Sequence, residues 1–191
     1  MSRIFTFSVL LTLSFPAAAA ERVRLQTSAG AIVIEVDTKR APITAGNFLR
    51  YVEERRFDNT RFYRAARNRK APRFGLVQGG INHIVSRARA PIAHEPTSRT
   101  GLRHVDGTVS MARNAPGTAM GDFFITIGAA PYLDARPGRT EGYAAFGKVV
   151  GGMDVVRAIL AMKTYPGGRS ANTMGQTIVA PVRILTARRV K

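Results

Sequence analysis

Short segments of strand-forming sequence, separated by turns, constrain the fold of this chain more than any other feature. Five of them follow residue 59: "TRFYRAA", "LVQGG", "GTVSMAR", "DFFITIG" and "YAAFGKVV". Segments of this length that are rich in β-branched and aromatic residues are typical of strands. The 18 glycines and 10 prolines also favour turns over long helices. The sequence therefore predicts a domain made mainly of β-strands.

The two ends of the domain add a hairpin, two helices and a last strand. Residues 22–37 alternate around a glycine turn and predict a β-hairpin. Residues 41–57 predict a helix, because Pro42 suits the first helical turn and the apolar residues that follow form one face. Residues 152–162 predict a second helix, and residues 182–190 predict the last strand. Many strands, two separated helices and no strand–helix alternation indicate a closed or sandwiched β domain.

The first twenty residues predict a cleaved signal peptide. Arg3 precedes an apolar run over residues 4–15, and a proline and four alanines follow that run. This order of basic, apolar and small residues is typical of secretory leaders, with the cut here after Ala20. The apolar run is shorter than the roughly 20 residues that span a bilayer, which argues against an uncleaved anchor. We therefore expect a leader over residues 1–20 and one mature domain over residues 21–191, outside the cytoplasm.

Cysteine content and charge limit what stabilises the mature domain and what it binds. The chain has no cysteine, so an apolar core must hold the fold without disulfides, and a cysteine-linked lipid anchor is excluded. The net charge is +17, and removal of Arg3 with the leader lowers it to +16. Such a charge suits acidic partners, nucleic acid or an anionic membrane surface. Export argues against nucleic acid, and a solvated basic surface is the simpler interpretation.

The remaining polar motifs give no sign of metal or covalent chemistry. The histidines His83, His94 and His104 match no zinc-ligand spacing. The sequence contains no G-x-S-x-G nucleophile turn, phosphate loop or dinucleotide fingerprint. Glu95 in "AHEPT" is expected to close a loop by accepting backbone N–H groups. We therefore expect neither a metal nor a cofactor.

Four stretches in order carry a family resemblance. They are "APITAGNFLRYV", "TRFYR" followed by "VQGG", "GTVSMARNAPGTAMGDFFIT", and "YLD" followed by "GYAAFGKVVGGMDVV". Together they resemble the cyclophilin-type peptidyl-prolyl cis–trans isomerases, and most closely the exported bacterial branch, over residues 22–189. The resemblance implies a mainly β fold, a closed eight-stranded antiparallel β-barrel capped by two α-helices, with the substrate groove on its outside. It also implies a monomer, no cofactor and a periplasmic location.

The chemistry of this family explains an arginine that follows two aromatic residues in "TRFYRAA", where no acid occurs from residue 59 to residue 94. Rotation about an X-Pro bond has a barrier of about 18–20 kcal/mol because the amide is conjugated, and no bond is made or broken. The enzyme needs to hold the proline ring and stabilise the twisted amide with a positioned cation. By resemblance, Arg64 is that catalytic cation, which donates to the proline carbonyl and to its nitrogen.

The resemblance also assigns the substrate groove. Three apolar residues are expected to line the proline pocket: Phe124, Leu133 and Leu76. Four residues are expected to border the substrate or hold Arg64: Tyr143, Gln78, Ala112 and Arg113. Phe123 is expected in the core instead, because it faces the opposite side of its strand from Phe124.

An insertion separates the family's arginine from its glutamine. Arg64 and Gln78 are fourteen residues apart, where the family usually has eight. The inserted "RNRKAPRFG" carries four cations and no acid, so it is expected to form an exposed loop that attracts acidic clients or only aids solubility. Gly75 stands where the family has a pocket phenylalanine. Either Phe74 swings into the pocket or the pocket lacks that wall.

Asp122 is a second departure, because the family usually has glutamine there. An ionised aspartate only accepts hydrogen bonds, whereas glutamine also donates. We expect Asp122 to accept a substrate backbone N–H or to pair with Arg64, and a tight pair would blunt catalysis.

The sequence thus predicts a peptidyl-prolyl cis–trans isomerase that acts on X-Pro bonds of unfolded or partly folded proteins outside the cytoplasm. One alternative is a non-catalytic module with the same fold that binds proline peptides. The other is a basic envelope-binding protein, whose binding would fall steeply with salt. Weak contact with anionic surfaces is compatible with each of these three hypotheses.

Overall fold

The computed structural model describes residues 20–82, 84–168 and 170–190. Nearly all of the predicted signal peptide and His83 lie outside the described residues. The strands are β1 (Glu21–Thr27), β2 (Gly30–Val36), β3 (Thr60–Arg67), β4 (Gly75–Gly80), β5 (Thr108–Met111), β6 (Asp122–Ile127), β7 (Ala145–Gly151), β8 (Thr164–Tyr165) and β9 (Thr177–Val190). The helices are α1 (Pro42–Glu53), α2 (Thr97–Thr100) and α3 (Met153–Ala161).

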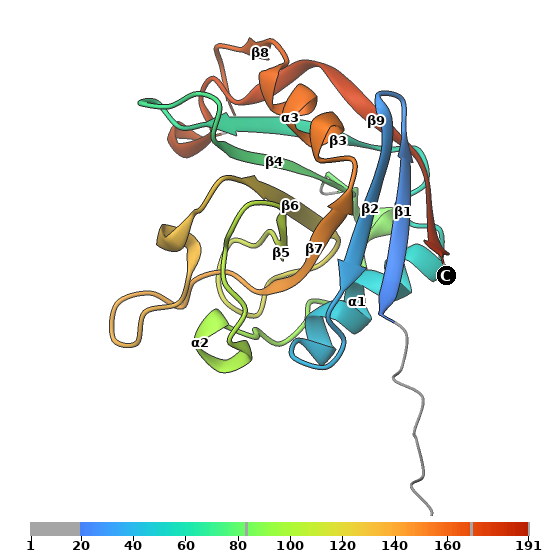
Figure 1. The fold of residues 1–191 in the computed structure, drawn as a ribbon, viewed down its shortest axis with the longest axis vertical. Helices are drawn as coiled ribbons and strands as arrows, with labels where there is room; N and C mark the ends of the chain where they lie inside the picture. Colours follow the sequence, from blue (N-terminus) through green and yellow to red (C-terminus); the bar gives the residue numbers. More distant parts are fainter. Residues whose placement is uncertain (1–19, 83, 169, 191) are drawn as a thin grey trace, which may run out of the picture.

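Eight of the strands close into a barrel (Figure 1). Neighbouring strands follow the order β1-β2-β7-β5-β6-β4-β3-β9, and β1 pairs with β9 to complete the circle. Every pairing is antiparallel, and the two-residue β8 pairs with β9 outside this circle. The predicted closed eight-stranded antiparallel β-barrel is confirmed.

Helices α1 and α3 lie at opposite ends of the barrel (Figure 1). Helix α1 is shorter than predicted because Arg55 adopts a φ of 53°, which a continuing helix does not allow. The four-residue α2 was not predicted, since a single turn carries no periodic pattern. Within the described residues, no helix has the length and apolar composition needed to cross a membrane.

The predicted N-terminal hairpin is confirmed, and it needs a glycine at its turn. Thr27 pairs with Gly30, so only two residues connect β1 to β2. Gly30 has a φ of 129°, and a Cβ atom there would lie 2.7 Å from a methyl carbon of Val155 in α3. The glycine therefore allows α3 to approach the hairpin closely.

Aromatic side chains fill the centre of the barrel. Phe123 of β6 makes edge-on contacts with Phe48 of α1 and with Phe62 of β3, at ring-centroid distances of 5.5 and 5.8 Å. Phe48 also packs 5.0 Å from Phe146 of β7. All four rings are fully buried. The expectation that Phe123 belongs to the core is confirmed, and this packing fixes the outward direction of its neighbour Phe124.

Candidate functional site

A groove with a volume of about 860 Å³ lies on the outside of the barrel. Strands β3, β4 and β6 form its floor, and the loop between β5 and β6, the 3₁₀ turn Pro131–Leu133, Tyr143 and residues 170–177 complete its lining. Its apolar residues form a cluster separate from the barrel interior. The two sides of strands β4 and β6 therefore serve different purposes, because alternate residues face the core and the groove.

A β-bulge in β3 places two consecutive side chains in the groove. Phe62 pairs with Gly79 of β4, and Arg64 pairs with Gln78, so Tyr63 is an extra residue in the register. Phe62 and Ala65 point into the core, whereas Tyr63 and Arg64 are both partly exposed. A bulge turns the strand in this way and re-aims its side chains.

Two glutamine side chains hold the guanidinium of Arg64. Its Nε donates to Oε1 of Gln176 over 2.7 Å, and its Nη1 donates to Oε1 of Gln78 over 2.8 Å. Burial lowers the pKa of Arg64 below its usual value, but an arginine remains charged near neutral pH. These two bonds use two of the five N–H donors of the guanidinium. The cation is therefore fixed in direction and can still donate to a ligand in the groove.

Gln78 is itself held by a chain of hydrogen bonds that ends at Asp122. Its Nε2 donates to the hydroxyl oxygen of Tyr63 over 2.7 Å. Burial raises the pKa of Tyr63, and the adjacent Asp122 carboxylate raises it further. Oδ1 of Asp122 accepts the backbone N–H of Asn82 over 2.7 Å. Asp122 thus influences Arg64 through Tyr63 and Gln78, a route that the sequence did not predict.

The apolar wall of the groove comes from β4, β6 and the 3₁₀ turn. Leu76, Phe124, Ala130 and Leu133 are buried and contact one another. The ring of Tyr143 meets Phe124 edge-on at 5.4 Å. This wall and the Arg64 cation line the same cavity, an arrangement that suits a small apolar ring attached to a polar amide.

A buried hydrogen-bonded triad supports this wall from behind. Nδ1 of His104 lies 2.7 Å from Oδ1 of Asp134, and its Nε2 lies 3.0 Å from Oγ of Ser110. The His104 ring stacks on Phe124 at 5.9 Å. Although these are the residue types of a hydrolase triad, Ser110 has no exposed surface, so no substrate reaches its hydroxyl. The triad supports Phe124 through the stacked His104 ring. It also fixes Asp134, which directly follows Leu133 in the chain.

Comparison with known families decides the assignment. The family model for the cyclophilin type peptidyl-prolyl cis-trans isomerase/CLD matches residues 22–188. The chain belongs to this family. A peptidyl-prolyl cis-trans isomerase of Acinetobacter baylyi is 37% identical, over 92% of this cyclophilin and 89% of the relative. Peptidyl-prolyl cis-trans isomerase A of Dickeya dadantii is 34% identical, over 87% of this chain and 85% of the relative. The activity expected from the sequence is therefore confirmed at the level of a peptidyl-prolyl cis–trans isomerase.

A solved structure shows the same fold. The cyclophilin type peptidyl-prolyl cis-trans isomerase of Cryptosporidium parvum superposes with a TM-score of 0.65, covering 91% of this chain and 99% of the other. The two sequences are 20% identical, so this likeness concerns the barrel alone.

The structure brings every predicted site residue of this cyclophilin to one cavity. All nine line the groove: Arg64, Leu76, Gln78, Ala112, Arg113, Asp122, Phe124, Leu133 and Tyr143. Arg113 stacks over Tyr143 at 4.9 Å and donates a hydrogen bond to the carbonyl oxygen of Gly142. Their placement agrees with the predicted roles, which stay predictions.

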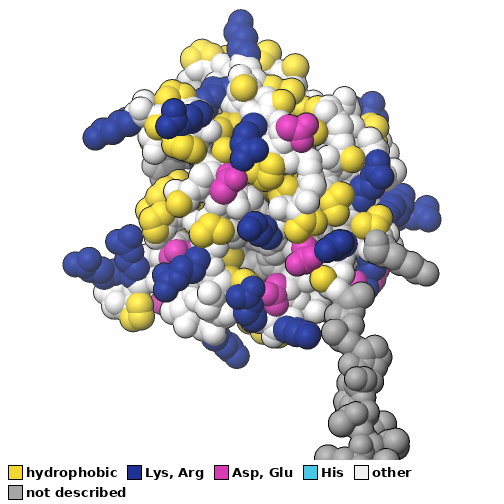
Figure 2. Space-filling view, viewed as in Figure 1, with side chains coloured by type: hydrophobic (Ala, Val, Ile, Leu, Met, Phe, Trp, Pro, Cys, Tyr) yellow, Lys and Arg dark blue, Asp and Glu magenta, His cyan; other side chains and the backbone are white. Residues whose placement is uncertain are grey.

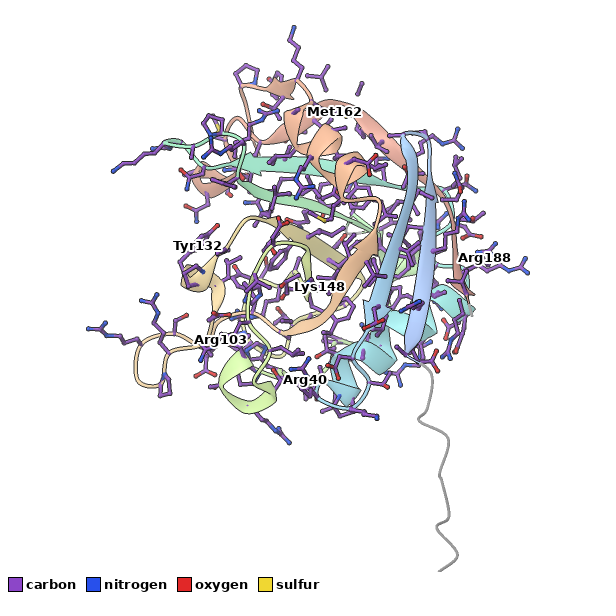
Figure 3. The ribbon with its side chains drawn as sticks, viewed as in Figure 1. Arg40, Arg103, Tyr132, Lys148, Met162 and Arg188 are labelled. Carbon is purple, nitrogen blue, oxygen red and sulfur yellow. The ribbon has the colours of Figure 1, made fainter. Side chains whose placement is uncertain are left out.

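The insertion differs from expectation at one end. Arg67 was expected in an exposed loop, but it belongs to β3, and its Nε donates to the carbonyl oxygen of Leu160 over 2.7 Å. Its Nη2 donates to the carbonyl oxygen of Met162, labelled in Figure 3 beside α3. Arg67 thereby satisfies carbonyl groups at the C-terminal end of α3, where unpaired acceptors gather. That expectation was wrong for Arg67.

Phe74 does not replace the missing pocket wall. The described residues that line the groove include Gly75 but not Phe74. Phe74 instead lies against Gly128, just after β6, with the guanidinium of Arg73 over its ring at 4.8 Å. Of the two expected possibilities, the structure shows the pocket without this wall.

Sequence reasoning missed further residues in and beside the groove, and three of them bear on its chemistry. Tyr63 was treated only as a strand residue, and the break in alternation after Phe62 was the signal for its bulge. Gln176 is 112 residues from Arg64, and its sequence context carried no signal. Tyr132 directly precedes Leu133, is 62% exposed and lies at the left edge of the molecule in Figure 3. An aromatic residue beside a predicted pocket residue could have indicated it.

Among the described residues, no group of three His, Cys, Asp or Glu side chains is arranged to hold a metal ion. Nε2 of His94 contacts the carbonyl oxygen of Glu141 at 2.9 Å, and His104 is engaged by Asp134 and Ser110.

Proposed function

We propose that this cyclophilin isomerises X-Pro bonds of unfolded and partly folded proteins outside the cytoplasm, with Arg64 as its catalytic residue. The observation that carries this proposal is the position of Arg64, which two glutamines hold beside the apolar wall of an open groove. The groove lies on the outside of a closed barrel, so a chain segment must be exposed to enter it. Unfolded and partly folded proteins offer such segments.

The geometry suits stabilisation of the twisted amide. The proline ring packs against Phe124, Leu76 and Leu133, which leaves its amide near the Arg64 guanidinium. As the amide twists, conjugation is lost, and the prolyl nitrogen gains a lone pair that can accept a hydrogen bond. Because the two glutamines hold Arg64 before the substrate arrives, the cation reorganises little in the transition state. Stabilisation that is stronger in the twisted state than in either planar state raises the rate.

The other groove residues position the chain on either side of the proline. Ala112 and Arg113 border the substrate backbone, and Tyr143 closes the rim of the pocket. Asp122 accepts the N–H of Asn82 and raises the pKa of Tyr63, so it supports Tyr63 and Gln78. Ion pairing of Asp122 with Arg64 is not needed to explain how either side chain is held.

The proposed role in folding is tested by refolding a protein whose slow step is proline isomerisation, which takes tens of seconds or longer when uncatalysed. Catalytic amounts of the mature protein should accelerate this slow phase at least several-fold. A second protein, whose slow phase does not depend on proline, serves as the control and should refold at an unchanged rate. Equal acceleration of both proteins, or of neither, would contradict the proposal.

The proposed location rests on the leader-like sequence and on where the barrel begins. Strand β1 starts at Glu21, so a cut after Ala20 removes no residue of the barrel. We expect the mature protein in the periplasmic fraction, with Glu21 as its first residue. A cytoplasmic protein that retains residues 1–20 would contradict the location but leave the catalytic proposal standing.

The expected monomer agrees with the closed barrel. Because β1 pairs with β9, the strands that the structure describes leave no long unpaired edge for a second copy to extend. Sedimentation of the mature domain should therefore give a monomer mass.

A further inference from the structure

We propose that the groove selects prolines flanked by acidic residues, because two basic loops border it at a distance from Arg64. This inference rests on the proposed function and specifies its substrate class. The first loop, residues 68–74, is the insertion loop between β3 and β4. The second, residues 135–142, is the rim loop between the 3₁₀ turn and β7. Both project from the left side of the molecule in Figure 1, the side on which Figure 3 labels Tyr132 of the groove.

The two loops carry a concentrated positive charge. Arg69, Lys70 and Arg73 lie on the insertion loop, and Arg136 and Arg139 lie on the rim loop; all five are exposed. Glu141 is the single acid in the two loop sequences. In Figure 2, basic side chains project from the left side of the molecule in its upper and in its lower half. A chain that lies in the groove and extends beyond it therefore meets positive charge.

Hydrogen bonds within the insertion loop fix its shape. The backbone N–H of Asn68 donates to the carbonyl oxygen of Phe74 over 2.9 Å, which closes the loop. Oδ1 of Asn68 accepts the backbone N–H of Lys70 over 2.9 Å. At the other end, Phe74 packs against Gly128. The loop thus holds its cations beside the groove instead of trailing into solvent.

The rim loop is fixed in a similar way. Arg136 and Thr140 exchange backbone hydrogen bonds of 2.8 and 3.0 Å, so the loop is a small hairpin. The backbone N–H of Ala135 donates to Oγ1 of Thr97 over 2.8 Å. Arg113, which lines the groove, donates to the carbonyl oxygen of Gly142 at the end of the loop. These contacts connect the rim loop directly to the substrate groove.

Elsewhere on the surface, acids pair with part of the positive charge. Seven acidic side chains form ion pairs with arginines: Glu21, Glu35, Asp37, Glu53, Glu54, Asp58 and Asp106. Among the described residues, none of these ion pairs includes a cation of the two loops. The two loops therefore keep their five cations free of ion pairs with the described acids, and both loops border the groove.

Salt screening separates this local charge from the charge of the whole protein. The Debye length is about 8 Å at physiological ionic strength, so cations far from the groove contribute little to the binding of a peptide in it. Cations on the loops remain within reach of residues a few positions from the proline. Because they are remote from the rotating bond, they should act on binding more than on the chemical step.

The test compares three peptides with the same Ala-Ala-Pro-Phe core, flanked on both sides by paired glutamates, serines or lysines. At about 20 mM salt, wild-type kcat/KM should be roughly three- to ten-fold higher for the glutamate peptide than for the serine peptide, and lowest for the lysine peptide. Most of the difference should appear in KM. Near about 0.5 M salt, the three values should converge.

Paired variants assign the effect to the loops. Arg69→Gln/Lys70→Gln and Arg136→Gln/Arg139→Gln each remove two exposed charges from one loop. The matched control, Arg24→Gln/Arg61→Gln, removes two exposed charges from strands β1 and β3, outside the lining of the groove. At physiological salt the loop variants should lose much of the glutamate preference, whereas the control should keep it. All variants should turn over the serine peptide within about two-fold of wild type.

Equal kcat/KM for the glutamate and lysine peptides at low salt would overturn the inference, as would a control pair that costs as much as the loop pairs. If wild type does not accelerate the serine peptide, the proposed function fails instead. In that case, calorimetry measures the affinity of the protein for the same three peptides. Equal affinities would overturn the proposed acid preference as well.

Discussion

The break in alternation at Tyr63 shows how one extra residue builds the site. Regular pleating would send Tyr63 and Arg64 to opposite sides of β3. The bulge sends both to the groove, where Tyr63 holds Gln78 and Gln78 holds Arg64. The sequence carried the trace of this bulge, because Phe62 and Ala65 are the core residues on either side of two polar-tipped ones. The alternation of apolar and polar residues predicted the strand, but the bulge within it was not predicted.

His104 makes the stability of the domain depend on pH. Burial holds the pKa of His104 below its ordinary value, although Asp134 opposes this shift. The unfolded chain takes up a proton near the ordinary pKa of about 6.5, whereas the native protein resists it. The free energy of unfolding should therefore fall as the pH drops from about 6.5 through the lower native pKa, by up to about 1.4 kcal/mol per pH unit.

Urea unfolding at a series of pH values between about 7.5 and 5 checks this prediction. The His104→Gln variant should show a flatter pH dependence, whatever its absolute stability. The matched control is His94→Gln, which removes the partly buried histidine outside the triad and should keep the wild-type slope. An unchanged slope in His104→Gln would assign the pH dependence to other groups.

Among the elements, α1 is positioned by an acid from a distant loop. Both carboxylate oxygens of Glu95 accept backbone N–H groups at its N-terminus, from Ile43 over 3.2 Å and from Thr44 over 2.7 Å. The hydroxyl of Thr44 adds a third bond of 2.6 Å. Helices leave these N–H groups unpaired and favour negative charge beside them. Glu95 accepts backbone N–H groups as predicted, but these groups belong to the start of α1 and not to a loop that Glu95 closes.

Removing this carboxylate should destabilise the barrel. Glu95 is 3% exposed, so Glu95→Ala leaves buried N–H groups without an acceptor and should cost about 2–4 kcal/mol of unfolding free energy. Glu95→Gln keeps an acceptor and should lose less. The exposed Glu141 provides the matched control, and Glu141→Ala should change stability by less than about 0.5 kcal/mol. Urea unfolding at neutral pH measures all three variants, and equal stability of Glu95→Ala and Glu141→Ala would contradict the prediction.

The elements that the sequence predicted are those in which local pattern and tertiary packing agree. The β1–β2 hairpin, α1, α3 and the central strands all have apolar residues at the spacing that their burial requires. The four-residue α2 and the two-residue β8 are too short for any period to appear. Strand β9 begins five residues before its predicted start, because Thr177 pairs with β3 and β8 and Ile178 pairs with β8. Backbone pairing decided that boundary without an apolar pattern.

Across the candidate site, motif order predicted position better than it predicted partners. The nine predicted residues line one groove, because family motifs fix which strand or loop carries each of them. The contacts of Arg64 with Gln176 and of Arg67 with α3 join residues more than 90 positions apart. Nothing in a single sequence reports such distant pairs when one partner lies outside every recognised motif.

At the scale of the whole molecule, the barrel separates stability from function. Its interior is filled by aromatic and aliphatic side chains, while the groove uses the outer faces of β3, β4 and β6. Changes in the groove can therefore alter catalysis while the barrel stays folded. This separation allows a direct test of the central claim that Arg64 in its groove performs the isomerisation.

The most direct test is cis–trans exchange of the serine-flanked Ala-Ala-Pro-Phe peptide, measured by NMR with wild type and with Arg64→Ala. Wild type should accelerate exchange, and Arg64→Ala should lower kcat/KM by about 100- to 1000-fold, the usual cost of removing a positioned charge-stabilising donor. The variant should keep the wild-type circular dichroism spectrum. A folded Arg64→Ala variant that retains most of the wild-type rate would contradict the account.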